Sequence, residues 1–290
     1  MNDKITGNHI LVLKNQMVLA AQEMEPTADG VLLRWRGTEV QVRADDIATV
    51  YATGQFNQIP IDPAVLSTLA TLERGISAYE AQGGARGRHT LCGASGRALT
   101  IIPNRSTDDL DVVTTEPLDQ FLVDRPEFHW DIPIEFMDEG LLRLMGDWSQ
   151  RTSSAKGPMG REFLIMHPLD TMMQKMLRWD LDRFATKDLQ DIDEIIRVLN
   201  PGIDTIRNLL CENPFRYVQA AGPLSVATEA LDSNTRTFLA RHLPGISYEA
   251  IVREANQNYA KQMQRANLNI TRVNDVDLRT KITPVNLGMG

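Results

Sequence analysis

Residues 109–113 alternate acidic and apolar side chains, and this alternation constrains the fold more than any other stretch of the chain. The segment reads Asp-Leu-Asp-Val-Val and follows a strand-like run at 99–102. Side chains on a β-strand point alternately to the two faces of the sheet, so Asp109 and Asp111 share one face and Leu110 points into the core. The pattern predicts a half-buried strand that carries two neighbouring carboxylates on its open face.

Two carboxylates this close repel each other unless a cation neutralises them. Mg²⁺ is the favoured cation, since it prefers oxygen ligands and is usually held by one or two carboxylates together with substrate phosphates. The alternative is a strand end at the surface with solvated acids, because an isolated Asp-x-Asp pair is common by chance. The small residues Ser95 and Gly96 favour the metal, since such a turn lets phosphates approach the backbone closely.

The stretch 95–111 resembles the signature of the nucleotidyltransferase superfamily, in which a Gly-Gly or Gly-Ser turn precedes a strand with Asp-x-Asp. The closer likeness is to bacterial nucleotidyltransferase-like toxins of the abortive-infection (AbiE) type and their uncharacterised relatives. One departure is Ser95-Gly96 where Gly-Gly or Gly-Ser is usual. The resemblance implies that Ser95, Gly96, Arg105 and Thr107 lie at the nucleotide. The matching residues are Gly96, Ala98, Leu99, Arg105, Thr107, Asp109 and Asp111.

A second cluster of charged residues lies in 167–196, where the apolar spacing predicts helices with a break near 185–186. A solvated helix face joined by salt bridges would give the same charge pattern. The order of residues again resembles the AbiE-type proteins, which have a Pro before a Lys-bearing helix, then Arg, then Lys-Asp-x-x-Asp. The matching residues are Pro168, Lys175, Arg183, Lys187, Asp188 and Asp191.

This second resemblance implies roles for four residues. Lys175 would contact triphosphate oxygens as a point charge. Asp188 would orient Lys175 or lie near the acceptor. Arg183 and Asp191 are also compatible with a structural role, because a buried ion pair that ties two helices together would look the same in the sequence.

Nucleotidyl transfer usually uses a third acid on a neighbouring strand. The candidate strand is 128–139, in which Asp131 and Glu135 share a face and Pro133 restricts the strand to an edge or a bulge. We prefer Glu135, whose neighbours are those of an inner strand, with Asp131 as the alternative. The expected metal ligands are therefore Asp109, Asp111 and Glu135.

Composition narrows the class of protein. The 290 residues carry a net charge of −8, which argues against a broad basic surface for nucleic acid. Cys92 and Cys211 lack metal or disulfide spacing, and no apolar run approaches the length of a membrane span. We expect a cytoplasmic protein without membrane contact. The loop 83–88 lacks the ending of a phosphate-binding loop and is read as a linker, in which Arg86 and Arg88 can touch a polyanion.

The predicted fold is α+β: a nucleotidyltransferase-like mixed sheet flanked by helices, with a β-rich N-terminal accessory region and a helical C-terminal region. The expected divisions are 1–83 for the accessory region, 84–200 for the core and 201–290 for the helical region with an extended tail. Asp62 and Pro63 predict the start of a helix over 61–82. Other expected elements are a strand or short helix at 9–21, a hairpin at 30–52, and helices at 139–150, 167–200 and 203–270.

The expected function is Mg²⁺-dependent transfer of a nucleoside monophosphate from a nucleoside triphosphate to a hydroxyl of RNA, such as tRNA, or of a protein. The resemblance adds a toxin-like role opposed by an antitoxin-like partner protein. The alternative is a binding or structural protein on a nucleotidyltransferase scaffold without activity. A third possibility is that both motifs are coincidental in an unrelated protein.

Overall fold

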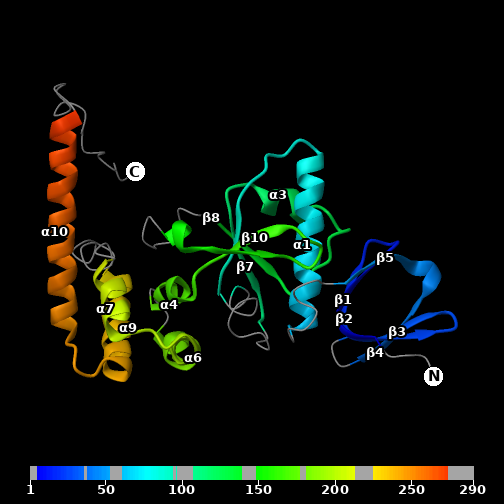
Figure 1. Cartoon of the computed structure of the whole chain (residues 1–290), viewed down its shortest axis with the longest axis horizontal. Helices are drawn as coiled ribbons and strands as arrows, with labels where there is room; N and C mark the ends of the chain where they lie inside the picture. Colours follow the sequence, from blue (N-terminus) through cyan, green and yellow to red (C-terminus); the bar gives the residue numbers. More distant parts are fainter. Residues whose placement is uncertain are drawn as a thin grey trace. The chain divides into compact units, whose positions relative to one another are not determined.

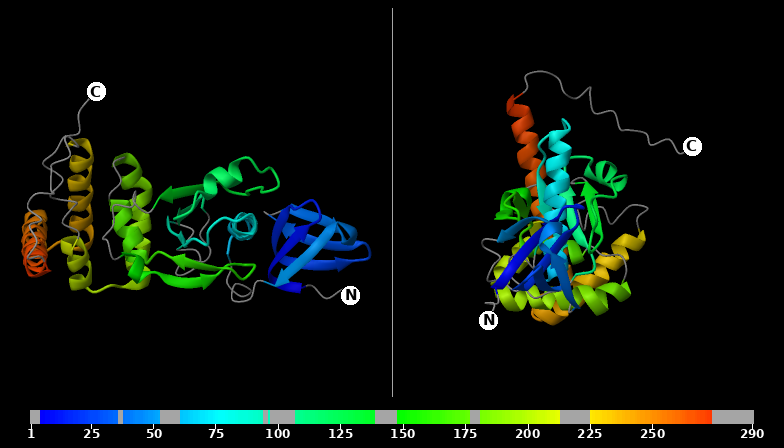
Figure 2. Two further views of the ribbon diagram at one scale, coloured as in Figure 1. Left: turned by 90° about the horizontal axis from the view of Figure 1, so that it is seen from above. Right: turned by 90° about the vertical axis from the view of Figure 1, so that its right-hand side faces the viewer.

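The chain forms an α+β structure with two compact units, one of Met1–Lys175 with Asp191–Leu199 and one of Met176–Gln190 with Asn200–Gly290. Figures 1 and 2 present the ribbon of the computed structural model from three directions. The structure describes residues 5–35, 38–52, 61–93, 96, 107–138, 148–176, 181–212 and 225–273.

The first unit begins with a five-stranded antiparallel sheet in the order β4-β3-β2-β1-β5. The hairpin expected at 30–52 is confirmed as β3 and β4. Residues 9–21, expected as a strand or a short helix, form parts of two strands joined at Gln16, whose φ is 73°. The strands are β1 (Ile5–Leu13), β2 (Val18–Thr27), β3 (Gly30–Trp35), β4 (Thr38–Arg43) and β5 (Ile47–Ala52), with a 3-10 turn at Ala44–Asp46.

Both faces of β1 are buried. Ile10 and Val12 belong to a large core cluster shared with helix α1, whereas Leu11 and Leu13 belong to a separate cluster inside the curved N-terminal sheet. A strand that is buried on both faces is apolar throughout rather than alternating. This explains why the sequence of 9–13 could not be assigned to a strand by its period.

Helix α1 (Pro63–Ala81) lies between the N-terminal sheet and the second sheet of the same unit (Figure 1). Its start is confirmed: the Asp62 carboxylate accepts a hydrogen bond of 2.8 Å from the Ala64 N–H. Every residue from Ala64 to Glu73 is buried. A helix that is buried all round is apolar or bonded on every side, and here the Thr71 hydroxyl donates to the Ser67 carbonyl while the Ser67 hydroxyl donates to the Asp131 carboxylate.

The second sheet is mixed and has the order β8-β7-β6-β10-β9. β7 pairs parallel with β8 and antiparallel with β6, and β6 pairs parallel with β10. Strand β8 lies at an edge of this sheet, as Pro133 just before it predicts. The strands are β6 (His89–Leu91), β7 (Leu110–Thr114), β8 (Ile134–Asp138), β9 (Ser153–Lys156) and β10 (Glu162–Ile165), with helix α3 (Leu118–Val123) between β7 and β8.

The helices that follow agree in part with the expected ranges. The break near 185–186 coincides with a π-helical turn at Phe184–Asp188, and α6 ends at Leu199, just before Pro201. The expected helix at 139–150 lies mostly outside the described residues. The extended tail expected from residue 271 is wrong for 271–273, which complete α10. The helices are α4 (Pro168–Met176), α5 (Leu181–Arg183), α6 (Leu189–Leu199), α7 (Ile203–Glu212), α9 (Ser225–His242) and α10 (Tyr248–Val273).

Among the helices that the structure describes, none combines the length and the apolarity that crossing a membrane requires. Cys92 and Cys211 are both buried and form no disulfide.

Candidate active site

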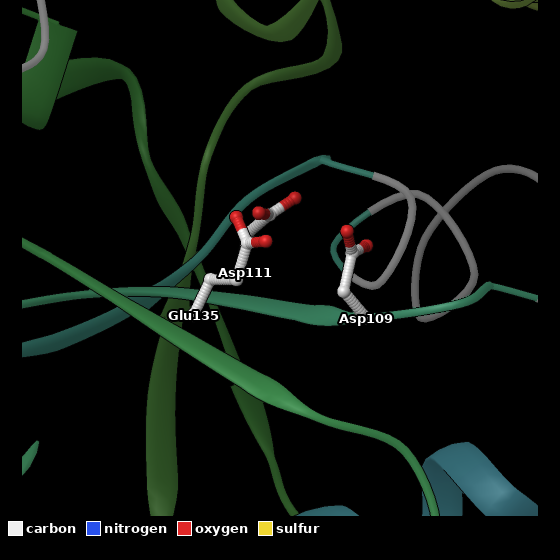
Figure 3. A group of neighbouring side chains, drawn as sticks. All are labelled: Asp109, Asp111 and Glu135. Carbon is white, nitrogen blue, oxygen red and sulfur yellow. The ribbon is translucent and has the colours of Figure 1, made fainter.

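Three carboxylates meet on the open face of the mixed sheet. Asp109, Asp111 and Glu135 each place one oxygen so that the three atoms lie within 4.8 Å of one another. Figure 3 shows the Asp111 and Glu135 carboxylates side by side, with the Asp109 carboxylate pointing to the same side of the strand. Asp109 and Asp111 are half-buried and Glu135 is exposed. We call these residues the acidic triad.

The strand register explains why the triad forms. β7 and β8 run parallel and place Asp111 opposite Glu135. Alternation along β7 sends Leu110 and Val112 into the core shared with α1 and leaves Asp111 on the opposite face. The backbone N–H of Leu110 donates to the Pro133 carbonyl at 2.8 Å, which fixes the start of β8 against the start of β7.

The strands β6 and β10 end level with the starts of β7 and β8, where the triad lies. Val112 pairs with Leu91 at the end of β6, and Leu91 pairs with Ile165 at the end of β10. In the next row, the Cys92 N–H donates to the Asp111 carbonyl at 3.1 Å and the Met166 N–H donates to the Leu91 carbonyl at 2.9 Å. Gly93 and α4, which follow β6 and β10, therefore leave the sheet at the same ends of the strands at which Asp111 and Glu135 lie.

Asp109 is oriented from within its own segment. The Thr107 hydroxyl lies 2.9 Å from the Asp109 carbonyl oxygen and 3.3 Å from its Oδ1. A hydroxyl two residues before an acid commonly forms such a local bond and limits the rotation of the carboxylate. Thr107, expected at the nucleotide from the family resemblance, is therefore placed to hold Asp109.

Gly93 is a site residue that sequence reasoning missed. Its φ is +61°, and a β-carbon added there would overlap the Asp111 carboxylate. Glycine alone combines this backbone conformation with so close an approach. The available signal was a glycine two residues after the strand β6.

Two expected site residues lie outside the described residues, namely Ser95 and Arg105. Gly96 is described and is buried. Its N–H donates to the Cys92 carbonyl at 3.1 Å, which closes one helical turn after β6, and a β-carbon at Gly96 would lie 2.9 Å from the Leu91 carbonyl oxygen. Gly96 thus packs against the end of β6.

The structure separates the two candidates for the third acid. Glu135 lies on β8 beside Asp111, whereas Asp131 precedes β8 and accepts a hydrogen bond from the Ser67 hydroxyl on α1. Asp131 is therefore held at α1, which packs on the face of the sheet opposite the acidic triad. The apolar neighbours of Glu135 were the signal that favoured it.

Lys175 forms a buried ion pair with Asp191. The Lys175 Nζ lies 2.6 Å from the Asp191 Oδ2, and the two side chains are 10% and 2% exposed. The pair joins α4 to α6. An ammonium has three donors, and Asp191 accepts from one of them.

Helix α4 is fixed at its start by a second ion pair. Arg151 donates to the buried Asp170 carboxylate through two nitrogens, at 2.6 and 3.0 Å. A bidentate guanidinium–carboxylate pair of this kind sets orientation as well as distance. It holds the first turn of α4 against the 3-10 turn Trp148–Arg151.

The remaining residues of the second cluster have different surroundings. Asp188 is fully buried in the π-helical turn, while Arg183 and Lys187 are exposed. We predicted that Asp188 orients Lys175 or lies near the acceptor, and this stays a prediction. The Lys175 ammonium forms its 2.6 Å ion pair with Asp191.

The surroundings of the triad are electrostatically negative. Burial raises the pKa of the Cys92 thiol well above its ordinary value, and the charges of Asp111 and Asp109 add to this effect. Cys92 is therefore a neutral thiol, and its Sγ lies 3.5 Å from the Asp111 carbonyl oxygen. It packs beside the triad and provides no nucleophile.

The donor set of the triad fits a hard divalent cation. Carboxylate oxygens from rigid strands are the ligands that Mg²⁺ prefers, and Mg²⁺ usually keeps several waters or substrate oxygens besides. No softer ligand joins the group, since among the described residues the cluster contains Asp and Glu alone. The triad can therefore hold Mg²⁺ or Mn²⁺ in a site that is open on the side of Glu135.

No protein-family model matches the chain, and no curated protein matches it. A search of solved structures gave a match to an antigenic nucleotidyltransferase-like protein from Paracoccidioides brasiliensis. The two chains are 17% identical, and the match covers 59% of this chain and 95% of the other, with a TM-score of 0.32. A TM-score this low does not establish a common fold, so the functional interpretation rests on the geometry of the triad.

Proposed function

We propose that the protein is a metal-dependent nucleotidyltransferase in which a hydroxyl group attacks the α-phosphate of a nucleoside triphosphate, takes up the nucleoside monophosphate and displaces pyrophosphate. The observation that carries this proposal is the acidic triad, in which Asp111 on β7, Asp109 just before β7 and Glu135 on β8 bring three oxygens within 4.8 Å of one another. Clustered acids on rigid elements are costly without a cation, so their convergence favours a metal site that phosphates share. The sequence resemblance of 95–111 and 168–191 supports the same reaction.

Each group has a role in this proposal. Asp111 on β7 and Asp109, the residue just before β7, would be two ligands of Mg²⁺. Glu135 on β8 would be the third protein ligand. The ion would neutralise charge on the attacking and leaving oxygens of an in-line displacement. Gly93 leaves room for the Asp111 carboxylate, and Lys175 adds positive charge for triphosphate oxygens.

The acceptor is proposed to be a hydroxyl of RNA, such as a tRNA end, or of a protein. Glu135 is the exposed member of the triad, so the site opens at the edge strand β8, where a large acceptor can approach. A toxin-like role with an antitoxin-like partner protein rests on the family resemblance alone. The expected setting for such a role is the cytoplasm.

Label transfer tests the proposal directly. Purified protein is incubated with each α-³²P nucleoside triphosphate, Mg²⁺, total RNA and cell extract. We expect the wild type and the control Asp119→Asn, whose side chain is exposed on α3, to label a macromolecule, and Asp111→Asn to fail. Labelling that survives in Asp111→Asn would contradict the assignment of the triad.

The alternative function is binding without chemistry on the same scaffold. The departure at Ser95-Gly96 favours this alternative. Mg²⁺-dependent nucleoside triphosphate binding without label transfer would support it, and loss of that binding in Asp109→Ala would place the bound nucleotide at the triad.

A further inference from the structure

A buried glutamate on α1 holds the turn that joins β9 to β10. The Glu73 Oε1 accepts a hydrogen bond of 3.0 Å from the Met159 N–H, and its Oε2 accepts one of 2.9 Å from the Arg161 N–H. Glu73 is 3% exposed. A β-carbon at Gly157, the first residue of the turn, would overlap the Glu73 carboxylate, so the two fit closely. We call this contact between Glu73 and residues 157–161 the latch.

The carboxylate of the latch has no ion pair among the residues that the structure describes. Both of its hydrogen bonds come from neutral backbone N–H groups. The guanidinium of Arg161 instead donates to both oxygens of Glu80, at 2.9 and 2.8 Å, and to the Ser77 hydroxyl at 3.1 Å. A buried carboxylate in such surroundings is costly while it is ionised and much less so once it is protonated.

The closed latch therefore favours the protonated form of Glu73. Burial raises the pKa of Glu73 from 4.5 to about 7, although the two N–H groups and the charge of Arg161 act in the opposite direction. Each carboxylate oxygen has two lone-pair sites, so a proton can bind one oxygen while both N–H bonds remain. In an open latch water would reach the carboxylate, and its pKa would return towards 4.5.

The groups around the latch leave this titration to Glu73. Glu80 stays ionised, because the hydrogen bond from Arg161 lowers its pKa. His89 on β6 is neutral above pH 5, because burial lowers its pKa to about 4. The charged residues that share a cavity of about 830 Å³ with Glu73 are Arg74, Glu80, Arg86, Glu127, Arg161 and Glu162.

We propose that Glu73 makes the β9–β10 turn a pH-sensitive latch, which stays closed on α1 while Glu73 is protonated and opens far more often once Glu73 is ionised. Opening lets water from the adjoining cavity reach the buried charge. The turn precedes β10, whereas the acidic triad lies level with the end of β10, so the latch acts at the opposite end of the sheet. It does not depend on the proposed nucleotidyl transfer.

Hydrogen–deuterium exchange of the full chain between pH 5 and pH 8, followed by mass spectrometry, tests the latch. The reporting amides are those of Gly157, Met159, Gly160 and Arg161, since all four are hydrogen-bonded in the closed turn. Protection factors correct for the intrinsic effect of pH on exchange. Because the closed form holds the proton more tightly, we expect the protection of the turn to fall on the order of 50-fold from pH 5 to pH 8.

Two variants separate the titration of Glu73 from its hydrogen bonds. Glu73→Gln cannot ionise, so the protection of the turn should no longer depend on pH. Glu80→Gln is the matched control, because it removes the other contact of the turn with α1, the pair of Glu80 and Arg161. It should lower the protection by a similar factor at every pH and keep the pH dependence of the wild type. Asp111→Asn should leave the exchange of the turn unchanged.

Low concentrations of urea distinguish opening of the latch from global unfolding. Local opening exposes little surface, so the protection of the turn should not depend on urea, whereas amides of 163–165 that exchange by global unfolding should lose protection. Two results would overturn the proposal. One is constant protection of the wild-type turn from pH 5 to pH 8. The other is the same protection and the same urea dependence in the turn and in β10, which would mean that the turn opens with the whole molecule.

Discussion

Gly93 lies against the carboxylate of Asp111, and a β-carbon at Gly93 would overlap that carboxylate. The residue before Gly93 donates its backbone N–H to the Asp111 carbonyl, so the two segments are fixed relative to each other. The position of a proposed metal ligand thus depends on the absence of a side chain on the neighbouring segment.

We expect Gly93→Ala to abolish metal binding, because the added methyl group displaces the Asp111 carboxylate. Mn²⁺ binding, followed by electron paramagnetic resonance, measures the effect. Gly83→Ala is the control, since Gly83 also has a positive φ of 91° but nothing lies within 4 Å of its added β-carbon. Both variants carry the backbone cost of roughly 1–3 kcal/mol, so a loss of Mn²⁺ in both would contradict a specific role of Gly93.

Asp111→Asn separates the repulsion within the triad from its metal affinity. In EDTA we expect the variant to be as stable as the wild type or up to about 1 kcal/mol more stable, because a like charge is removed. With Mg²⁺ the wild type gains thermal stability and the variant does not. Thermal unfolding with and without Mg²⁺ measures both effects, and Asp119→Asn should behave as the wild type. A stabilisation by Mg²⁺ that persists in Asp111→Asn would place the ion elsewhere.

The Lys175–Asp191 pair should be strongly coupled. Removal of one partner leaves a buried charge, so Asp191→Ala is expected to lower the free energy of unfolding by about 3–5 kcal/mol. The double variant Lys175→Ala/Asp191→Ala should lose less than the sum of the single changes, by roughly 1–3 kcal/mol. Urea unfolding of the four proteins gives the coupling energy.

A control for this cycle lies on the same helix. Arg197 and Glu194 form an i,i+3 pair at 3.9 Å, and the Arg197 side chain is 73% exposed. Exposed pairs contribute little, so the corresponding cycle should give a coupling energy under about 0.5 kcal/mol. Equal coupling in the two cycles would argue against a special role for the buried pair.

Glu73 should make stability depend on pH. Burial raises its pKa from 4.5 to about 7, while hydrogen bonds from the Met159 and Arg161 backbones and the charge of Arg161 act in the opposite direction. The folded protein therefore holds this proton more tightly than the unfolded chain. The stabilisation is complete below about pH 4.5 and is lost as the pH rises through about 7, a difference of roughly 3 kcal/mol.

Glu73→Gln tests this sign, because glutamine imitates the protonated form. We expect the stability of the variant relative to the wild type to rise between pH 4.5 and 7 and to level off above that range. Urea unfolding at several pH values provides the comparison. A constant difference across this range would mean that Glu73 does not titrate with the predicted shift.

The parts of the site that follow from local periodicity were predictable from sequence. Alternation placed Asp109 and Asp111 on one face, and the apolar neighbours of Glu135 pointed to an inner strand. The role of Gly93 was not predictable, because it arises from a contact between segments 18 residues apart. The distance between Lys175 and Asp191 was not predictable for the same reason, because it arises from tertiary packing. The role predicted for Asp188, to orient Lys175 or to lie near the acceptor, stays a prediction.

The fold was predictable to a similar degree. The cap at Asp62 and the edge position imposed by Pro133 are local signals, and both were read correctly. The hairpin of β9 and β10 carried no such signal, because β9 reads Ser-Ser-Ala-Lys and lacks the alternation of a half-buried strand. Its place in the sheet is set by pairing with β10, which in turn pairs with β6.

The burial of α1 on all sides has a consequence for folding. Ile10 and Val12 of the N-terminal sheet and Leu110 and Val112 of the mixed sheet belong to one core around this helix. A chain shortened to begin at residue 61 would expose the apolar side of α1 to water and would be prone to aggregate. The two sheets should therefore melt in a single cooperative step, and the N-terminal strands act as an integral wall of the molecule that carries the triad, not as a detachable module.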